Sequence, residues 1–286
     1  MNGVTGVVRR LVPRGVRNWI RSPARSLAWL ADRTRHAVGW DATVEVRPGW
    51  HVRSHPAALR TAYAPQFADP AQAEEMDAFI ACCRPDMTLF DLGAHFGLFS
   101  LAALHYGGPG ARAIAVDPSP AAQRMMRIQA GLNGATDRMQ LIRAGVSDRT
   151  GRIDFVSVGV IAAGYYTAPE AGHSRRERTT VEAVTVDDLV QQGGSTPSHI
   201  KIDVEGFEAA ALRGAHRTLR AQPRPLVFLE VHVAMMRDRG QDPAEPLTLL
   251  ESAGFDTFAT DGTPLAIEAV VSRPLVRLVA RPRGER

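Results

Sequence analysis

Two groups of polar residues in this sequence have the types and spacing that chemistry requires. The first begins with DLGAHFG at 91–97, and Asp117 follows twenty residues after Gly97. A glycine turn between a strand and a helix lets the backbone approach a ligand, and a carboxylate at the end of the next strand can bind ribose hydroxyls. The glycines do not form the G-x-G-x-x-G pattern, which argues against NAD(P). This group therefore predicts a different nucleoside-containing cofactor.

The second group lies in HIKIDVEGFE, residues 199–208. Lys201 is the only lysine among 34 basic residues. Side chains alternate along a strand, so Lys201 and Asp203 should share a face, and Glu205 joins them if the strand continues. A buried ammonium and carboxylate this close are expected to pair or to serve a polar site. The next apolar run ends with Glu230 and His232, which should reach the same edge of the sheet.

This second group could remove a proton from a hydroxyl. His232 is the natural base by its intrinsic pKa, with Asp203 and Glu205 as alternatives. A divalent metal held by the cluster is a further alternative, but nothing in the spacing requires one. Lys201 either forms a satisfied structural ion pair, orients Asp203, or contacts an acceptor oxygen. Lysine differs from arginine here because a guanidinium is bulkier and effectively never deprotonated.

The elements that must position these residues alternate between strands and helices. Expected strands are 88–93, 111–116, 139–146, 152–158, 181–186, 199–204, 225–231, 255–260 and 266–271, with helices from 69 to 83, 97 to 106, 119 to 133 and 207 to 220 and one beginning at 242. Such alternation predicts an α/β fold with a doubly wound, mostly parallel sheet and an antiparallel C-terminal strand. A small hairpin with its turn at Pro48-Gly49 is expected at 43–54.

Several segments together resemble the FkbM-type methyltransferase family. They are DLGAHFG, AVDPSPAAQRMM, AGVSDRTG, TVDDL, IKIDVEGFEAAALRGA and FLEVH, and they cover about residues 87–232. The resemblance implies a class I, Rossmann-like fold that binds S-adenosylmethionine and methylates hydroxyl groups of sugars, polyketides or other secondary metabolites. It implies a cofactor loop at 91–97, where His95 departs from the usual Asn, a ribose contact at Asp117, and an adenine border near Gly145–Ser147. The candidate cofactor residues are Asp91, Gly93, His95, Gly97, Asp117, Ser119 and Val146, and the catalytic candidates are Lys201, Asp203, Glu205 and His232.

Charge and composition limit the remaining possibilities. The net charge is +4, but residues 1–40 carry +7 and residues 273–286 carry +4, which leaves −7 on the body. An acidic body argues against nucleic-acid binding. We expect a basic, partly helical appendage at 1–40, a hairpin cap at 41–68, the methyltransferase domain at 69–272 and a basic tail at 273–286. The basic appendage could make weak contact with a membrane surface.

The two cysteines are adjacent, no apolar run is long enough to span a membrane, and no signal peptide is recognisable, so a cytoplasmic location is expected. The leading hypothesis is a small-molecule O-methyltransferase. N-methylation, a catalytically silent partner protein and an NAD(P)-dependent oxidoreductase are the alternatives. The segment 159–180 is the expected specificity loop, but it contains no recognisable substrate code.

Overall fold

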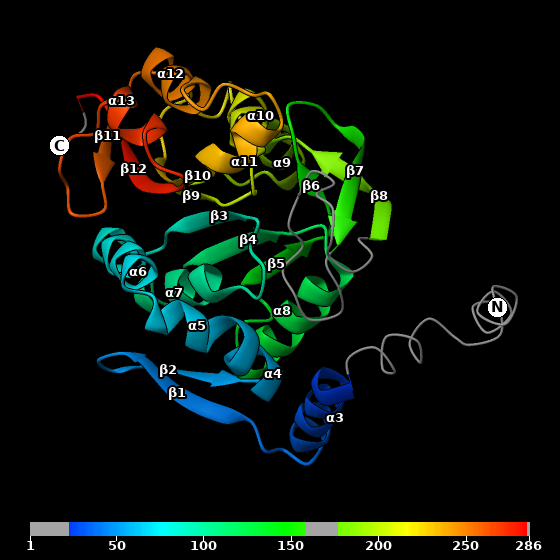
Figure 1. Cartoon of the computed structure of the whole chain (residues 1–286). Coiled ribbons are helices and arrows are strands. Elements are labelled where there is room, and N and C mark those ends of the chain that lie inside the picture. Colours follow the sequence, from blue (N-terminus) through cyan, green and yellow to red (C-terminus); the bar gives the residue numbers. More distant parts are fainter. Residues whose placement is uncertain (1–22, 158–176, 285–286) are drawn as a thin grey trace, which may run out of the picture.

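A seven-stranded sheet forms the centre of the protein (Figure 1). The computed structural model describes residues 23–157 and 177–284, so most of the expected specificity loop and the first half of the basic appendage lie outside the described residues. The sheet has the order β11-β12-β10-β9-β3-β4-β5. Its strands are β3 (Thr88–Leu92), β4 (Arg112–Val116), β5 (Met139–Ile142), β9 (His199–Ile202), β10 (Leu226–Val231), β11 (Phe255–Ala259) and β12 (Val276–Pro282).

The strands β10, β9, β3, β4 and β5 run parallel to one another, whereas β12 is antiparallel to both of its neighbours. This is the class I methyltransferase arrangement, and it confirms the expected fold class. All four residues of β9 are buried, because helices cover both faces of a parallel sheet and leave no polar face.

Each face of the sheet has its own hydrophobic cluster. Phe90 and Leu92 of β3 belong to one cluster and Leu89 to the other, as the alternation of side chains along a strand requires. One cluster includes residues of α6 (Pro70–Cys82), α7 (Leu98–Tyr106) and α8 (Pro120–Leu132), and the other includes residues of α9 (Val186–Gly193), α10 (Glu208–Arg213), α11 (Val233–Asp238) and α12 (Glu245–Ser252).

The N-terminal cap packs onto the α6–α8 face. The hairpin of β1 (Ala42–Arg47) and β2 (Trp50–Ser54) contributes Trp50 and Val52 to that hydrophobic cluster. The chain then passes through α4 (Pro56–Ala58), the π-helix η1 (Leu59–Tyr63) and α5 (Ala64–Ala68) before α6. A separate three-stranded sheet of β6 (Gly145–Val146), β8 (Glu177–Val184) and β7 (Gly151–Ser157) follows β5.

The described part of the basic appendage is helix α3 (Pro23–Ala37). It exposes Leu27 and Leu30, and Val38 and Trp40 are exposed just beyond it. Within residues 23–157 and 177–284, no helix combines the length and the apolar character that crossing a membrane demands. Contact of residues 1–40 with a membrane surface stays a prediction.

Two predictions near the C-terminus are wrong. Residues 266–271 form helix α13 (Ile267–Val271) rather than a strand. Most of the predicted basic tail is β12, which lies inside the sheet between β10 and β11, so the catalytic domain does not end at 272. Arginines gave this segment the composition of a tail. Its apolar residues Val276, Leu278 and Ala280 nevertheless alternate and are buried as in a half-buried strand.

Candidate active site

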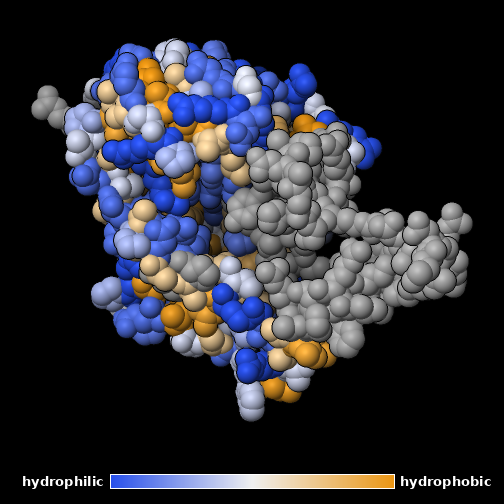
Figure 2. Space-filling view, in the orientation of Figure 1, coloured by the Kyte–Doolittle hydropathy of each residue, from blue (hydrophilic) through white to orange (hydrophobic). Residues whose placement is uncertain are grey.

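A cavity of about 460 Å³ lies beyond the carboxyl ends of β3, β4, β9 and β10. This is the edge at which open α/β sheets bind ligands, and the volume falls in the usual range for small-molecule sites. In the space-filling view the surface is hollowed between the upper and lower parts of the molecule (Figure 2). The cavity wall includes the loop after β3, the residue that follows β4, and the polar ends of β9 and β10.

Asp91 holds the loop after β3 in place. Its Oδ2 accepts hydrogen bonds from the backbone N–H of Ser100, at 3.1 Å, and from the Ser100 hydroxyl, at 2.6 Å. Asp91 is 2% exposed, and burial raises the pKa of its carboxyl group. These bonds join the end of the strand to the first turn of α7. They therefore hold the loop in a fixed position relative to α7.

Two glycines in this loop have left-handed backbone conformations. Gly93 has φ of 83° and Gly97, the N-cap of α7, has φ of 77°. A Cβ atom on Gly93 would lie 1.8 Å from the carbonyl oxygen of Asp203. Only glycine fits such a contact. The loop therefore packs directly against the residue that follows β9, and this packing brings the two predicted groups together.

Asp117 lies at the end of β4 and faces the same loop. Its Oδ2 accepts the backbone N–H of His95 at 3.0 Å, and its Oδ1 accepts that of Ser119 at 2.8 Å. Burial raises the pKa of Asp117 to about 7, although these two hydrogen bonds act in the opposite direction. The twenty-residue spacing thus places a carboxylate against the glycine loop, where it lines the cavity.

The remaining cofactor candidates divide into two sets. His95 and Val146 line the cavity. Burial lowers the pKa of His95 to about 4, so its ring is neutral, and it stacks on Phe96 with ring centroids 3.9 Å apart. Ser119 is not part of the cavity wall. Its hydroxyl caps α8 by accepting the backbone N–H of Ala122 at 3.3 Å.

These residues fit an S-adenosylmethionine molecule. The Nε2 atom of His95 is buried and has no hydrogen-bond partner among residues 23–157 and 177–284, so it is available to a ligand. Asp117 lines the cavity directly after β4, where a carboxylate can bind the hydroxyl groups of a ribose. The loop 93–97, Asp117 and Val146 would hold the nucleoside.

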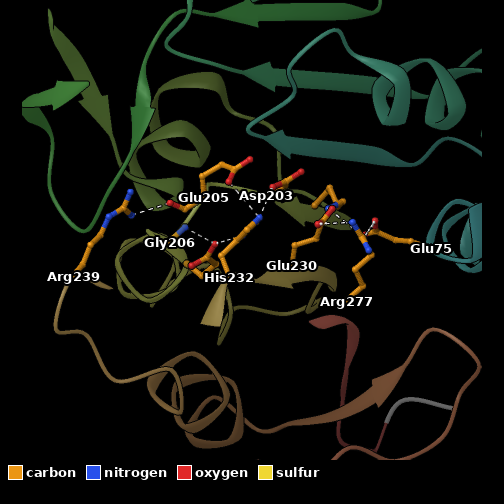
Figure 3. Close-up of polar contacts among 10 residues, drawn as sticks. Glu75, Asp203, Glu205, Gly206, Glu230, His232, Arg239 and Arg277 are labelled. Atoms are coloured by element: carbon orange, nitrogen blue, oxygen red, sulfur yellow. Dashed lines mark hydrogen bonds and ion pairs between the residues drawn. The ribbon is translucent and has the colours of Figure 1, made fainter. Parts of the chain in front are cut away.

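The polar residues at the ends of β9 and β10 separate into two charge clusters (Figure 3). The first, which we call the paired cluster, consists of Glu75, Lys201, Glu230 and Arg277. Lys201 Nζ lies 2.9 Å from Glu75 and 3.0 Å from Glu230, and Arg277 lies 3.2 Å from each of the same carboxylates. Two positive and two negative charges therefore balance.

Lys201 is 1% exposed and its ammonium also lies 5.1 Å from the ring centroid of Phe99. Burial alone lowers the pKa of Lys201, but Glu230 and Glu75 outweigh burial, and the pKa rises above its ordinary value. Lys201 and Arg277 lower the pKa of Glu230 to about 2 despite its burial. The ion pairs of Lys201 are with these two glutamates, and a direct pair with Asp203, one of the two predicted alternatives, is not formed.

The second cluster, which we call the open cluster, consists of Asp203, Glu205 and His232. The Nε2 atom of His232 lies 3.7 Å from Asp203 Oδ1 and 3.4 Å from Glu205 Oε2. Strand β9 ends at Ile202, two residues before the predicted end, and Glu205 has a left-handed φ of 53°, so the strand does not continue to Glu205. The turn nevertheless directs this carboxylate toward His232.

Glu208 is a member of the site that sequence reasoning missed. It is fully buried, and its Oε1 lies 2.8 Å from His232 Nδ1 while accepting the backbone N–H of Gly206 at 2.8 Å. Arg239 supports the same turn by donating to the carbonyl oxygen of Glu205 at 2.8 Å. Glu208 follows Glu205 by three residues, and nothing in that spacing distinguishes it from an ordinary residue of a helix N-terminus.

The open cluster retains protons near neutral pH. Burial would lower the pKa of His232, but the hydrogen bond to Glu208 and the charges of Asp203 and Glu205 raise it to about 9. Burial raises the pKa of Glu205 to about 7 and that of Asp203 well above its ordinary value. The negative charge here exceeds what one imidazolium balances, in contrast to the paired cluster.

A glycine loop after β3, a carboxylate after β4 and an open polar cluster around one cavity, on this sheet order, are features of the class I S-adenosylmethionine-dependent methyltransferase fold. The methyltransferase FkbM domain matches residues 91–257, more than half of the 286 residues. The chain therefore belongs to the FkbM methyltransferase family. This confirms the resemblance seen in the sequence.

Solved methyltransferase structures are similar to this chain at low identity. The FkbM methyltransferase from Methylobacillus flagellatus is 14% identical with a TM-score of 0.43, over 79% of this chain and 55% of that one. The precorrin-6y C5,15-methyltransferase from Geobacter metallireducens is 14% identical with a TM-score of 0.42, over 74% of this chain and 87% of that one. A TehB-like methyltransferase from Corynebacterium glutamicum is 14% identical with a TM-score of 0.40, over 73% of this chain and 88% of that one. No curated protein matches the chain significantly.

Proposed function

We propose that this protein transfers a methyl group from S-adenosylmethionine to a hydroxyl group of a small molecule, such as a sugar, a polyketide or another secondary metabolite. The single observation that carries the proposal is the open cluster. Asp203, Glu205 and His232 converge on the wall of the cavity that the cofactor loop also lines. A hydroxyl must lose its proton as it is methylated, whereas a neutral amine needs less help from a base.

In this proposal the two ends of the cavity have different tasks. The loop 93–97, Asp117 and Val146 bind and orient the cofactor, which supplies an electrophilic methyl group. The open cluster binds the acceptor hydroxyl, and its proton is lost there. The contact of Gly93 with the Asp203 carbonyl fixes the distance between the two ends, because neither can move without the other.

The paired cluster has a positioning task. Glu230, Lys201 and Arg277 line the cavity but satisfy one another's charge, so they fix the ends of β9, β10 and β12. Lys201 then acts through the position of β9, and a direct contact between its ammonium and the acceptor oxygen stays an untested alternative.

The proposal is tested with matched acceptors. The purified protein is incubated with labelled S-adenosylmethionine and with pairs of small molecules that share a scaffold and differ in a hydroxyl or an amine. We expect S-adenosylhomocysteine and a methyl ether from the hydroxyl member, identified by mass spectrometry. Methylation of the amine members alone would replace the proposal by N-methylation. Calorimetry checks the cofactor separately, and binding of NADH without binding of S-adenosylmethionine would contradict the assignment of the loop.

A further inference from the structure

The open cluster has more carboxyl groups around it than cationic side chains. Asp203, Glu205 and Glu208 surround a single imidazole. The guanidinium of Arg239 donates a hydrogen bond to the backbone carbonyl of Glu205 at 2.8 Å, and its charge acts to lower the pKa of the Glu205 carboxyl group. In the paired cluster a few ångströms away, by contrast, each carboxylate has two cationic partners.

The donor atoms of the open cluster lie about as far from one another as the ligand atoms of a single bound ion do. One oxygen of Asp203, one oxygen of Glu205 and one nitrogen of His232 all lie within 4.8 Å of one another. Donors bound to a single Mg²⁺ at about 2.1 Å lie about 3 Å apart when adjacent and about 4 Å apart when opposite. The measured distances of 3.4 and 3.7 Å from His232 Nε2 fall between these values.

One of these three donor atoms has no hydrogen-bond partner in the described part of the chain. Asp203 Oδ1 is buried and has no hydrogen-bond partner among the described residues. A buried carboxylate oxygen without a donor is costly, so something outside the chain is expected to meet it. Neither Asp203 nor Glu205 lies within ordinary hydrogen-bond geometry of His232 Nε2.

Glu208 sets the imidazole in the orientation that a metal ligand needs. It holds Nδ1 of His232 at 2.8 Å and is itself fixed by the backbone N–H of Gly206. Metal-binding histidines almost always have their second nitrogen held by a carboxylate or a carbonyl in this way, which directs the other nitrogen at the ion. Here Nε2 is the free nitrogen, and it faces Asp203 and Glu205.

We propose that Asp203, Glu205 and His232 bind one divalent cation of the Mg²⁺ or Mn²⁺ type at the cavity wall, with Glu208 as the positioning residue for His232. Two carboxylates and one imidazole suit such a hard ion, and three protein donors leave coordination positions for a ligand in the cavity. A hydroxyl oxygen that contacts the ion has a lowered pKa. This use of the ion rests on the proposed methylation of a hydroxyl, whereas the binding of the ion does not.

The test measures binding of Mn²⁺ alone. Free Mn²⁺ is followed by electron paramagnetic resonance as the full-length protein is titrated, with no methyl acceptor present. We expect one equivalent to bind to the wild type. Asp203→Asn, Glu205→Gln and His232→Gln should each weaken binding at least tenfold, and Glu208→Gln should weaken it about tenfold or more through the orientation of His232. Mg²⁺ should displace Mn²⁺ by competition.

Asp238→Asn is the matched control, because Asp238 is an exposed carboxylate at the end of α11. It should leave binding unchanged, and circular dichroism verifies that every variant is folded. A wild type that binds no Mn²⁺ overturns the metal site, even if the same preparation methylates hydroxyls. Binding that survives both Asp203→Asn and Glu205→Gln also overturns it. Conversely, Mn²⁺ binding by a protein that methylates only amines supports the site and contradicts the proposed function.

Discussion

The paired cluster and the open cluster lie side by side at the ends of the same two strands, but their buried charges are compensated differently. In the paired cluster, Lys201 and Arg277 each contact both Glu75 and Glu230, and the charges cancel. In the open cluster, two carboxylates and the neighbouring Glu208 surround one imidazole, and Asp203 Oδ1 has no hydrogen-bond partner within the described part of the chain. Closed charge networks stabilise a structure or position its elements, while incomplete ones are ready to accept a ligand or a proton.

Removing a charge from the open cluster should have the largest effect on turnover. We predict that Asp203→Asn lowers kcat for methyl transfer about 100-fold or more, because the hydroxyl then loses part of the group that deprotonates it. The free energy of unfolding should stay the same or rise, since one of several like charges is removed. Steady-state assays and urea unfolding check the two parts. A normal kcat would mean that the open cluster is not where the proton is lost.

Removing a charge from the paired cluster should instead affect stability most. Lys201→Met leaves two buried carboxylates with a single arginine, and we predict a loss of about 3–5 kcal/mol in the free energy of unfolding. Adding Glu75→Gln to that variant restores the balance and should recover part of the loss, as a double-mutant cycle in urea would show. If Lys201→Met stays fully stable but loses activity, Lys201 acts directly on the reaction and the comparison fails.

Lys201→Arg tests whether this site contains lysine because it has no room for the larger arginine side chain. The side chain is fully buried between two glutamates and Phe99, so the larger guanidinium should cost about 1–3 kcal/mol by overpacking. Thermal unfolding measures the effect. Arg277→Lys is compared with it, because that variant makes the opposite exchange, arginine to lysine, in the same cluster. A variant with wild-type stability and activity would show that the choice of lysine has no physical cause.

At the cofactor end of the cavity, Asp117→Ala should weaken S-adenosylmethionine binding by about 1–3 kcal/mol, the usual range for a lost hydrogen bond to a charged group. Calorimetry measures the dissociation constant, and Asp137→Ala, which removes an exposed carboxylate, is the control. An unchanged dissociation constant in Asp117→Ala would refute the ribose contact.

The last prediction concerns the pH dependence of the free energy of unfolding, to which His199 contributes. This residue is fully buried, its ring lies 2.8 Å from the Ser198 hydroxyl and 2.9 Å from the Cys82 carbonyl oxygen, and burial lowers its pKa to about 4. The unfolded state, with a pKa of about 6.5, therefore binds more protons between pH 6.5 and 4, so stability falls as the pH drops through that window.

Between pH 7 and pH 5 His199 should contribute a loss of about 2 kcal/mol. Urea unfolding of the wild type and of His199→Gln at both pH values isolates this contribution, because all other titrating groups are common to the two proteins. The wild type should lose more stability than the variant on acidification. Equal losses would mean that His199 is protonated in the folded state.

Sequence reasoning predicted the parallel sheet, the glycine loop and the carboxylate that follows β4, because these depend on local spacing. It also placed Asp203, Glu205 and His232 at one edge of the sheet, since the carboxyl ends of parallel strands meet there. It failed for β12, whose arginines resembled those of a tail, and for α13, whose short apolar run could form either element.

What the sequence determined by itself was the set of chemical groups at the cavity: a glycine turn, a carboxylate after β4, and acids and a histidine at the ends of strands. Only the tertiary structure decided how the charges were shared. Glu75 reaches the site from α6 and Arg277 from β12, and together they satisfy Lys201 and Glu230 and leave His232 as the ion-pair partner of Asp203. Ion pairing depends on distances across the whole chain, and no local pattern of residues specifies those distances.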